Sequence, residues 1–202
     1  MDSSECRALW GQMITGRCKI LGTFTAGERS NLVFAEGEPI REPLSGRRLQ
    51  VLERILSGSS GKAIAIDLGI TQSTVTLEAR RALAALGYVG STSRVPFALA
   101  ILFHAAHANR PAAIERAREL DADGQWCEVL RAPISRLLQG LPPAVCEVVR
   151  MHAQGISHAE IAARRHTSTR TVANQLATAF QRLGVSGRSG LLSYLAAHEQ
   201  AS

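Results

Sequence analysis

The sequence predicts a mainly helical fold with short β-hairpins, in which one four-helix unit occurs twice in tandem. Three observations support this prediction. The composition is that of a globular chain, the chain aligns with itself at an offset of 97 residues, and apolar residues in both aligned segments recur at helical spacing. The 202 residues are 46% hydrophobic and 20% charged, which is enough to bury a core and excludes a disordered or fibrous chain.

The internal repeat aligns residues 44–87 with residues 141–184 without a gap. Identical positions, named in the first copy, include Leu44, Val51, Gly58, Ser60, Ile64, Ala65, Thr74, Val75, Leu86 and Gly87. The alignment extends upstream, where Gly27 corresponds to Gly124. Self-similarity over this length indicates a duplicated structural unit.

Each copy ends in a segment with the apolar stripe of an amphipathic helix. The stripe comprises Val75, Ala79, Ala82, Leu83 and Leu86 in the first copy, and Val172, Leu176, Ala179, Phe180 and Leu183 in the second. Thr71 and Ser168 precede these helices as N-caps, and Gly87 and Gly184 are expected to end them.

A shorter helix is expected before each long one, over residues 62–68 and 158–165. Two helices joined by a tight turn, the second longer and amphipathic, form the helix-turn-helix arrangement. Gly69 lies in the turn of the first copy, whereas His166 stands in the second, which leaves the geometry of that turn open.

Two β-hairpins are expected outside the repeats. Residues 17–24 and 31–36 flank a turn that contains Gly27, which predicts the first hairpin. Residues 117–120 and 125–131 predict the second, although a helix over 111–119 is an alternative. The expected organisation is therefore a hairpin segment, a first helix-turn-helix unit, an apolar linker helix with the second hairpin, and a second unit, at residues 1–43, 44–94, 95–140 and 141–202.

The repeated unit resembles the LuxR/FixJ-type DNA-binding domain, a four-helix unit of many bacterial transcription regulators. The second copy follows the family pattern more closely, in the run AQGISHAEIAARRHTSTRTVANQLATAFQRLGVSGRSGLLSYL. The first copy departs from it with Ala63, Ser73 and an acidic Glu78. We find no separate receiver or ligand-binding domain, so regulation by phosphorylation or by a diffusible signal does not follow from the resemblance.

The resemblance implies binding to double-stranded DNA, with Arg170, Thr171 and Asn174 at contact positions. Arginine can pair with guanine or with a phosphate, and asparagine and glutamine can pair with adenine. Outward positions on the predicted helices and their flanks complete the candidate set, which comprises Arg164, Arg165, Ser168, Thr169, Arg170, Thr171 and Asn174 in the second copy and Gln72, Ser73, Thr76 and Arg80 in the first. An outward arginine such as Arg80 can equally be a solvated charge.

The charge is placed as a DNA-binding surface requires. The net charge is +6, with seven Lys and Arg against three Asp and Glu in residues 44–94, and six against three in residues 141–202. The other two segments are close to neutral. Local basic excess of this kind is the electrostatic footprint of a surface that meets phosphates.

Other functions lack their residue patterns. The four cysteines, Cys6, Cys18, Cys127 and Cys146, have no zinc-ligand spacing, and His104 and His107 are expected to be packed histidines rather than metal ligands. No nucleophile elbow or phosphate loop is present, so we expect neither an enzyme nor a cofactor. The sequence has no secretory or transit signal and no apolar run of membrane-spanning length, which predicts a cytoplasmic protein.

The apolar linker helix is expected to join the two halves. Phe97, Ile101, Leu102 and Phe103 would pack the units into an internal pseudo-dimer, or this helix would mediate a homodimer. Because the outward residues differ between the copies, the expected DNA site is asymmetric. The alternative function is a protein-interaction module that docks on RNA polymerase or another regulator, with base reading lost in the first copy, where Leu77 faces outward.

Overall fold

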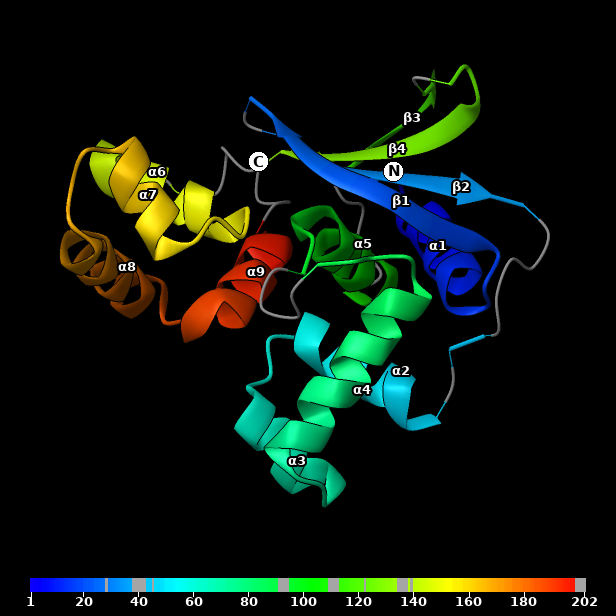
Figure 1. Cartoon of the computed structure of the whole chain (residues 1–202), viewed down its shortest axis with the longest axis horizontal. Helices are drawn as coiled ribbons and strands as arrows, with labels where there is room; N and C mark the ends of the chain where they lie inside the picture. The colour runs from blue at the N-terminus through cyan, green and yellow to red at the C-terminus, as the bar shows by residue number, and fades with distance from the viewer. Residues whose placement is uncertain are drawn as a thin grey trace.

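The computed structural model describes residues 1–27, 29–37, 43–44, 46–90, 95–108, 113–121, 123–133, 138 and 140–198. Both halves of the chain run in the order helix, hairpin, three helices, and the second half ends in one further helix, α9 (Figure 1). The elements of the first half are α1 (Ser3–Ile14), β1 (Cys18–Ala26), β2 (Arg29–Glu36), α2 (Gly46–Leu56), α3 (Gly61–Leu68) and α4 (Gln72–Ala85). Those of the second half are α5 (Phe97–Ala108), β3 (Glu115–Leu120), β4 (Trp126–Pro133), α6 (Pro143–Ala153), α7 (His158–Arg164), α8 (Thr169–Leu183) and α9 (Gly187–His198).

The two hairpins form one antiparallel sheet with the strand order β1-β2-β4-β3. Both predicted hairpins are therefore present, and β3 excludes the alternative helix in its part of residues 111–119; residues 111 and 112 lie outside the described residues. The expected division of the chain at 43, 94 and 140 stays a prediction, but the hairpins on either side of the first unit share this sheet.

The β2–β4 pairing is symmetric about its own centre. Leu32 pairs with Leu130, and Val33 pairs with Val129. At the offset of 97, Leu32 corresponds to Val129 and Val33 to Leu130, so each of these pairs maps onto the other. The sheet thus joins the two halves around a pseudo-two-fold axis, which is the arrangement of an isologous dimer interface within one chain.

Helix α5 forms the centre of the core. Its side chains from Phe97 to Phe103 are all buried, as are those of Ala105 and Ala106, so the helix is apolar on every side. It contacts α1, both central strands, α2 of the first unit and α9 of the second. In Figure 1 it lies below the sheet, with α2 to α4 at the bottom of the view and α6 to α8 at the left.

The linker helix packs within the core of one chain. The residues expected to join the halves, Phe97, Ile101, Leu102 and Phe103, share one core with Leu52 of α2 and Leu195 of α9. Each of these residues is at most 5% exposed within a single chain, which favours the internal pseudo-dimer over a homodimer through the same residues. The oligomeric state stays a prediction.

Helix α1 was not expected, because we assigned residues 1–43 to a hairpin segment. Asp2 caps it: its carboxylate accepts from the amide of Glu5, and the Glu5 carboxylate accepts from the amide of Asp2. This is a capping box, and its sequence signature was present. The face formed by Cys6, Leu9, Trp10 and Met13 is buried, mainly against α5.

The two helix-turn-helix turns use different residues for the same backbone shape. Gly69 adopts a φ of +62° after α3, and His166 adopts a φ of +49° after α7. The second turn is therefore formed by a residue with a side chain in the left-handed region, which usually favours glycine. The turn of the second copy, whose geometry the sequence left open, therefore has the same backbone conformation as the turn of the first copy.

Arg188 of α9 fastens the second unit to the start of α5. Its guanidinium donates to the carbonyl of Val95 at 2.7 Å and to the carbonyls of His152 and Ala153 at 3.1 and 2.7 Å. The last two are carbonyls at the C-terminal end of α6, which lack helical partners. The Arg188 side chain thus caps the C-terminal end of α6 and holds Val95, just before α5, next to it.

Gly87 marks the point where α4 meets the sheet, and its replacement should cost more than that of its counterpart. The amide of Ile20 donates to the carbonyl of Leu86 at 2.7 Å, and a Cβ on Gly87 would lie 2.3 Å from the Ile20 oxygen. Gly184 also has a positive φ but nothing within 4 Å of such a Cβ. We expect Gly87→Ala to lower the free energy of unfolding by about 1 to 3 kcal/mol more than Gly184→Ala, as measured by urea denaturation. Equal losses would contradict this packing.

Candidate nucleic-acid interface

Helix α8 presents one exposed polar face, set by its cap and its buried stripe. The Ser168 hydroxyl accepts from the amide of Thr171 at 3.0 Å and so fixes where the helix starts. Val172, Leu176 and Ala179 are buried. The candidate residues Thr169, Arg170, Thr171 and Asn174 consequently project into solvent, as do Ser168 and Arg164. This first turn and outer face form the surface that a recognition helix offers to a DNA groove.

Helix α4 repeats this construction in the first unit. The Thr71 hydroxyl accepts from the amide of Thr74 at 3.1 Å, and Val75, Ala79, Ala82 and Leu83 are buried. The candidate residues Gln72, Ser73, Thr76 and Arg80 are exposed. The candidates on both helices therefore lie on the exposed faces that the helical periodicity predicted. Their contact with DNA stays a prediction.

Arg165 differs from the other candidates. It is half-buried, donates to the carbonyl of Ala144 and lies 3.5 Å from the Glu147 carboxylate. These contacts fasten the end of α7 to the start of α6. The sequence did not reveal this role, because the partners lie about twenty residues away and belong to another helix.

The first unit neutralises part of its own positive charge. Glu78 of α4 is mostly buried and lies 3.4 Å from Arg48 and 2.9 Å from Arg81. The corresponding residue in the second unit is the uncharged Gln175. Glu78 therefore packs between two arginines rather than projecting toward a DNA backbone.

The outer surfaces of the two units differ in kind. Leu77 is 44% exposed on α4 at the position of Asn174, and Ile66 is 70% exposed on α3 at the position of Ala163. Asp67 likewise stands where the second unit has Arg164, and it pairs with Arg54. The first unit thus offers apolar and acidic groups where the second offers amide and guanidinium groups.

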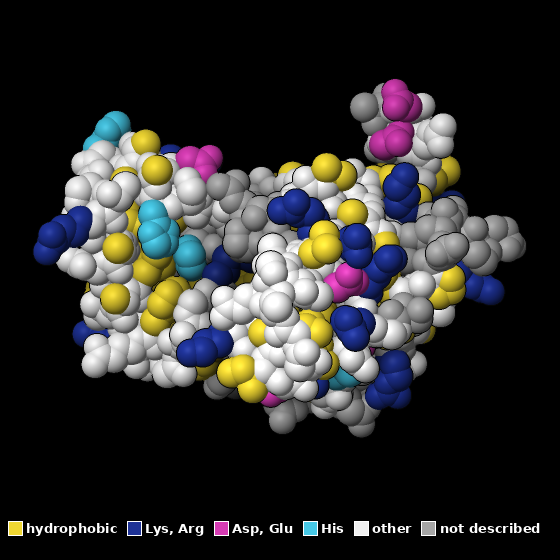
Figure 2. Space-filling view, turned by 60° about the horizontal axis from the view of Figure 1, so that its bottom comes forward, with side chains coloured by type: hydrophobic (Ala, Val, Ile, Leu, Met, Phe, Trp, Pro, Cys, Tyr) yellow, Lys and Arg dark blue, Asp and Glu magenta, His cyan; other side chains and the backbone are white. Residues whose placement is uncertain are grey.

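The charge distribution on this side of the molecule is basic. Figure 2 shows Lys and Arg side chains over both helical units, with few acidic side chains between them. Such a surface attracts polyanions over a distance and holds phosphates on contact.

The histidines on α5 are structural. Nε2 of His104 lies 2.8 Å from the carbonyl of Leu56, and burial lowers the pKa of this imidazole. His107 bonds the carbonyl of Phe103 through Nδ1 at 2.8 Å. Within the described residues, no three His, Cys, Asp or Glu side chains gather as metal ligands would, and no helix there is long and apolar enough to cross a bilayer.

Comparison with known families identifies both helical units. Residues 42–93 match the family of bacterial regulatory proteins of the luxR type, and residues 131–183 match region 4 of sigma-70. No curated protein and no solved structure matches the chain. The chain therefore carries two helix-turn-helix DNA-binding domains in tandem, and both matched families are regulators rather than enzymes.

The two matches refine the resemblance read from the sequence. The sequence predicts that the second copy is the closer match to the LuxR pattern, but the luxR family matches the first copy and sigma-70 region 4 matches the second. The second match ends at Leu183, before α9 begins. The helices it includes are α6 and the two helices of the helix-turn-helix, α7 and α8.

His152, at the end of α6, should make the protein sensitive to acid. Burial lowers the pKa of His152 to about 4, and the nearby His158 and Arg188 add repulsion. The unfolded chain binds this proton below a pH of about 6.5, whereas the folded chain does so only near 4. The free energy of unfolding should therefore be highest above pH 6.5 and fall as the pH drops toward 4.

The measurement is urea denaturation at pH 7.5, 6, 5 and 4. His152→Gln should reduce the loss of stability between the first and the last pH. His166→Asn, which changes an exposed histidine in a turn that asparagine tolerates, should leave the loss unchanged. The same pH dependence in His152→Gln as in the unmodified protein would contradict the assignment.

Proposed function

We propose that this protein is a transcriptional regulator that reads an asymmetric duplex DNA site, with α8 as the principal reading helix and α4 as the secondary one. The observation that carries the proposal is the face of α8. Thr169, Arg170 and Asn174 are exposed there, and Arg170 forms no ion pair with a described residue. Their guanidinium and amide groups can make bidentate contacts with guanine and adenine in the major groove.

The asymmetry of the site follows from the two units. Ser73 stands at the position of Arg170, Leu77 at that of Asn174 and Asp67 at that of Arg164. The pseudo-two-fold arrangement of the β2–β4 pair supports binding to two half-sites, which in helix-turn-helix dimers lie roughly 34 Å apart. Because the reading residues differ, the half-sites should differ in sequence.

Selection from a random duplex pool tests the proposal. The purified protein is incubated with the pool at moderate salt, and the retained duplexes are sequenced. We expect an enriched motif without a palindrome, and an affinity that falls steeply with added salt because bound phosphates release counterions. Retention without a motif would contradict sequence-specific reading.

Arg170 should contribute more to binding than Arg80. We expect Arg170→Ala to weaken binding to the selected duplex about 5- to 150-fold, which corresponds to one bidentate base contact, and Arg80→Ala to weaken it less. Fluorescence anisotropy with a labelled duplex measures both affinities. Both side chains are exposed, so neither change should affect folding. Equal effects, or none, would contradict the ranking of the two helices.

A second candidate function is docking of the first unit on a protein, such as RNA polymerase or another regulator. The exposed Leu77 and Ile66 and the neutralising Glu78 favour it for this unit alone. In this case α8 would bind DNA while α3 and α4 bind the partner.

Substitutions at one pair of equivalent positions, Leu77 and Asn174, distinguish DNA reading by the first unit from its docking on a protein. We expect Leu77→Asn to change the affinity for the selected duplex by less than about 3-fold and Asn174→Leu to lower it by about 10-fold or more, because asparagine can pair with adenine. The anisotropy titration serves again. A loss with Leu77→Asn as large as that with Asn174→Leu would assign base reading to both units and argue against the docking role.

A further inference from the structure

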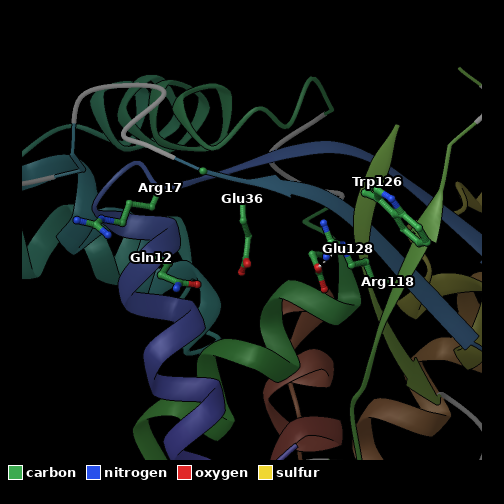
Figure 3. Close-up of a pocket in the computed structure, with 7 residues that line it drawn as sticks. Gln12, Arg17, Glu36, Arg118, Trp126 and Glu128 are labelled. Atoms are coloured by element: carbon green, nitrogen blue, oxygen red, sulfur yellow. Dashed lines mark ion pairs between the residues drawn. The ribbon is translucent and has the colours of Figure 1, made fainter. Parts of the chain in front are cut away.

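A polar cavity of about 410 Å³ lies at one end of the sheet, away from the helix-turn-helix units. In Figure 3, Gln12 and Arg17 lie on the side of α1, Glu128 and Arg118 lie on the opposite side, and Glu36 points between them from the end of β2. The volume is within the range of pockets that bind small molecules. Nothing in the proposed DNA-binding function uses these side chains.

The floor of the cavity consists of two carboxylates that pair with arginines and can still accept hydrogen bonds. Arg116 lies 2.8 Å from the Glu36 carboxylate and 3.0 Å from the Glu128 carboxylate. Its guanidinium offsets one of the two negative charges, and Arg118 lies 3.8 Å from the Glu128 carboxylate. Each carboxylate keeps lone pairs for further donors. A ligand with N–H groups can therefore bind here.

The walls add positive charge and an aromatic surface. Arg17 is exposed and forms no ion pair with any described residue. Trp126 is 60% exposed, and the Arg118 guanidinium lies 5.2 Å from the centre of its ring. The guanidinium lies over the ring, so only the part of the indole that it leaves exposed provides a stacking surface for a planar ring, and the guanidinium itself is a partner for an anion.

The pseudo-two-fold relation supplies an internal comparison. A second cavity, of about 260 Å³, lies at the opposite end of the β2–β4 pair. At the offset of 97, its residues Arg29, Ile114 and Pro133 correspond to Trp126, Arg17 and Glu36.

The protein's own groups satisfy one another in this second cavity. Arg29 lies 2.7 Å from Glu115, and the amino group of Met1 donates to the carbonyl of Ile114 at 2.7 Å. The aromatic, cationic and carboxylate groups that a ligand could use occur in the first cavity at the positions where the two halves differ.

We propose that the first cavity binds a nucleoside monophosphate. The base stacks on Trp126 and donates its N–H groups to Glu128 and Glu36, and the phosphate pairs with Arg17. This combination of ring, donors and anion matches the groups on the walls and floor. The cavity then serves as an effector site, because α1 and the sheet that form it pack on α5, which contacts helices of both DNA-binding units.

Tryptophan fluorescence without DNA tests the proposal. The chain has two tryptophans, Trp126 at 60% exposure and Trp10 at 4%, so quenching of the red-shifted emission reports on Trp126. AMP, GMP, CMP and UMP are each titrated, with inorganic phosphate alongside. We expect saturable quenching by at least one nucleotide, with a Kd of roughly 0.1 mM, and none by phosphate.

Matched variants separate specific binding from quenching by collision. Arg17→Ala should weaken binding about 10-fold, because it removes a charged partner of the phosphate. Arg29→Ala, in the second cavity, should leave the titration unchanged. Trp126→Phe should retain binding in calorimetry and lose the fluorescence change. Urea denaturation of each variant verifies that it folds.

Two results would overturn the proposal: no saturable quenching by any of the four nucleotides, or equal affinity in Arg17→Ala and the unmodified protein. Because the titration contains no DNA, its failure leaves the proposed DNA-binding function intact. Conversely, loss of a DNA motif in the selection experiment says nothing about this cavity.

Discussion

The arrangement of the whole protein depends on the antiparallel pairing of β2 with β4. Each hairpin by itself is a two-stranded ribbon, which is marginally stable in water. Joined at Leu32–Leu130 and Val33–Val129, they make one sheet whose inner face carries Leu32, Phe34, Leu130 and Ala132 into the core. The pairing also fixes the two halves relative to each other, because the Leu32–Leu130 and Val33–Val129 pairs map onto each other at the offset of the repeat. The two DNA-binding units are thus attached to a shared support.

Helix α5 packs against this sheet and against helices of both units, so that they share a single hydrophobic core. A helix that is apolar on all sides needs a partner on each side, and here α1, the sheet, α2 and α9 supply them. An interface of this kind between two separate chains would depend on protein concentration. Within one chain it forms at any concentration, and the residues on either side of it are free to differ.

Local features of the sequence predicted most of the local structure, with α1 as the exception, because the capping box of Asp2 and Glu5 was overlooked. Contacts between distant residues account for the rest of what was missed. The stripe from Val75 to Leu86 and the caps Thr71 and Ser168 gave α4 and α8 correctly, because periodicity and capping act within one or two turns. The β2–β4 pairing joins strands 97 residues apart, and no nearby residue specifies it. The contacts of Arg165 with α6 and of Glu78 with Arg48 were missed for the same reason, and the cavity beside Trp126 draws its residues from four separate elements.

The pattern of differences between the halves shows which constraints act on each position. Residues that pack inside a unit remain alike, as Ile64 and Ile161 or Val75 and Val172 do, since each must fill the same space between the same helices. Equivalent residues on the surface differ in chemical type between the halves. Ser73 corresponds to Arg170, and Arg29 corresponds to Trp126. The two subunits of a homodimer cannot differ in this way, because each substitution occurs in both subunits at once. Covalent duplication removes that restriction, so one half can keep the groups that meet DNA while equivalent surfaces of the other half acquire different partners.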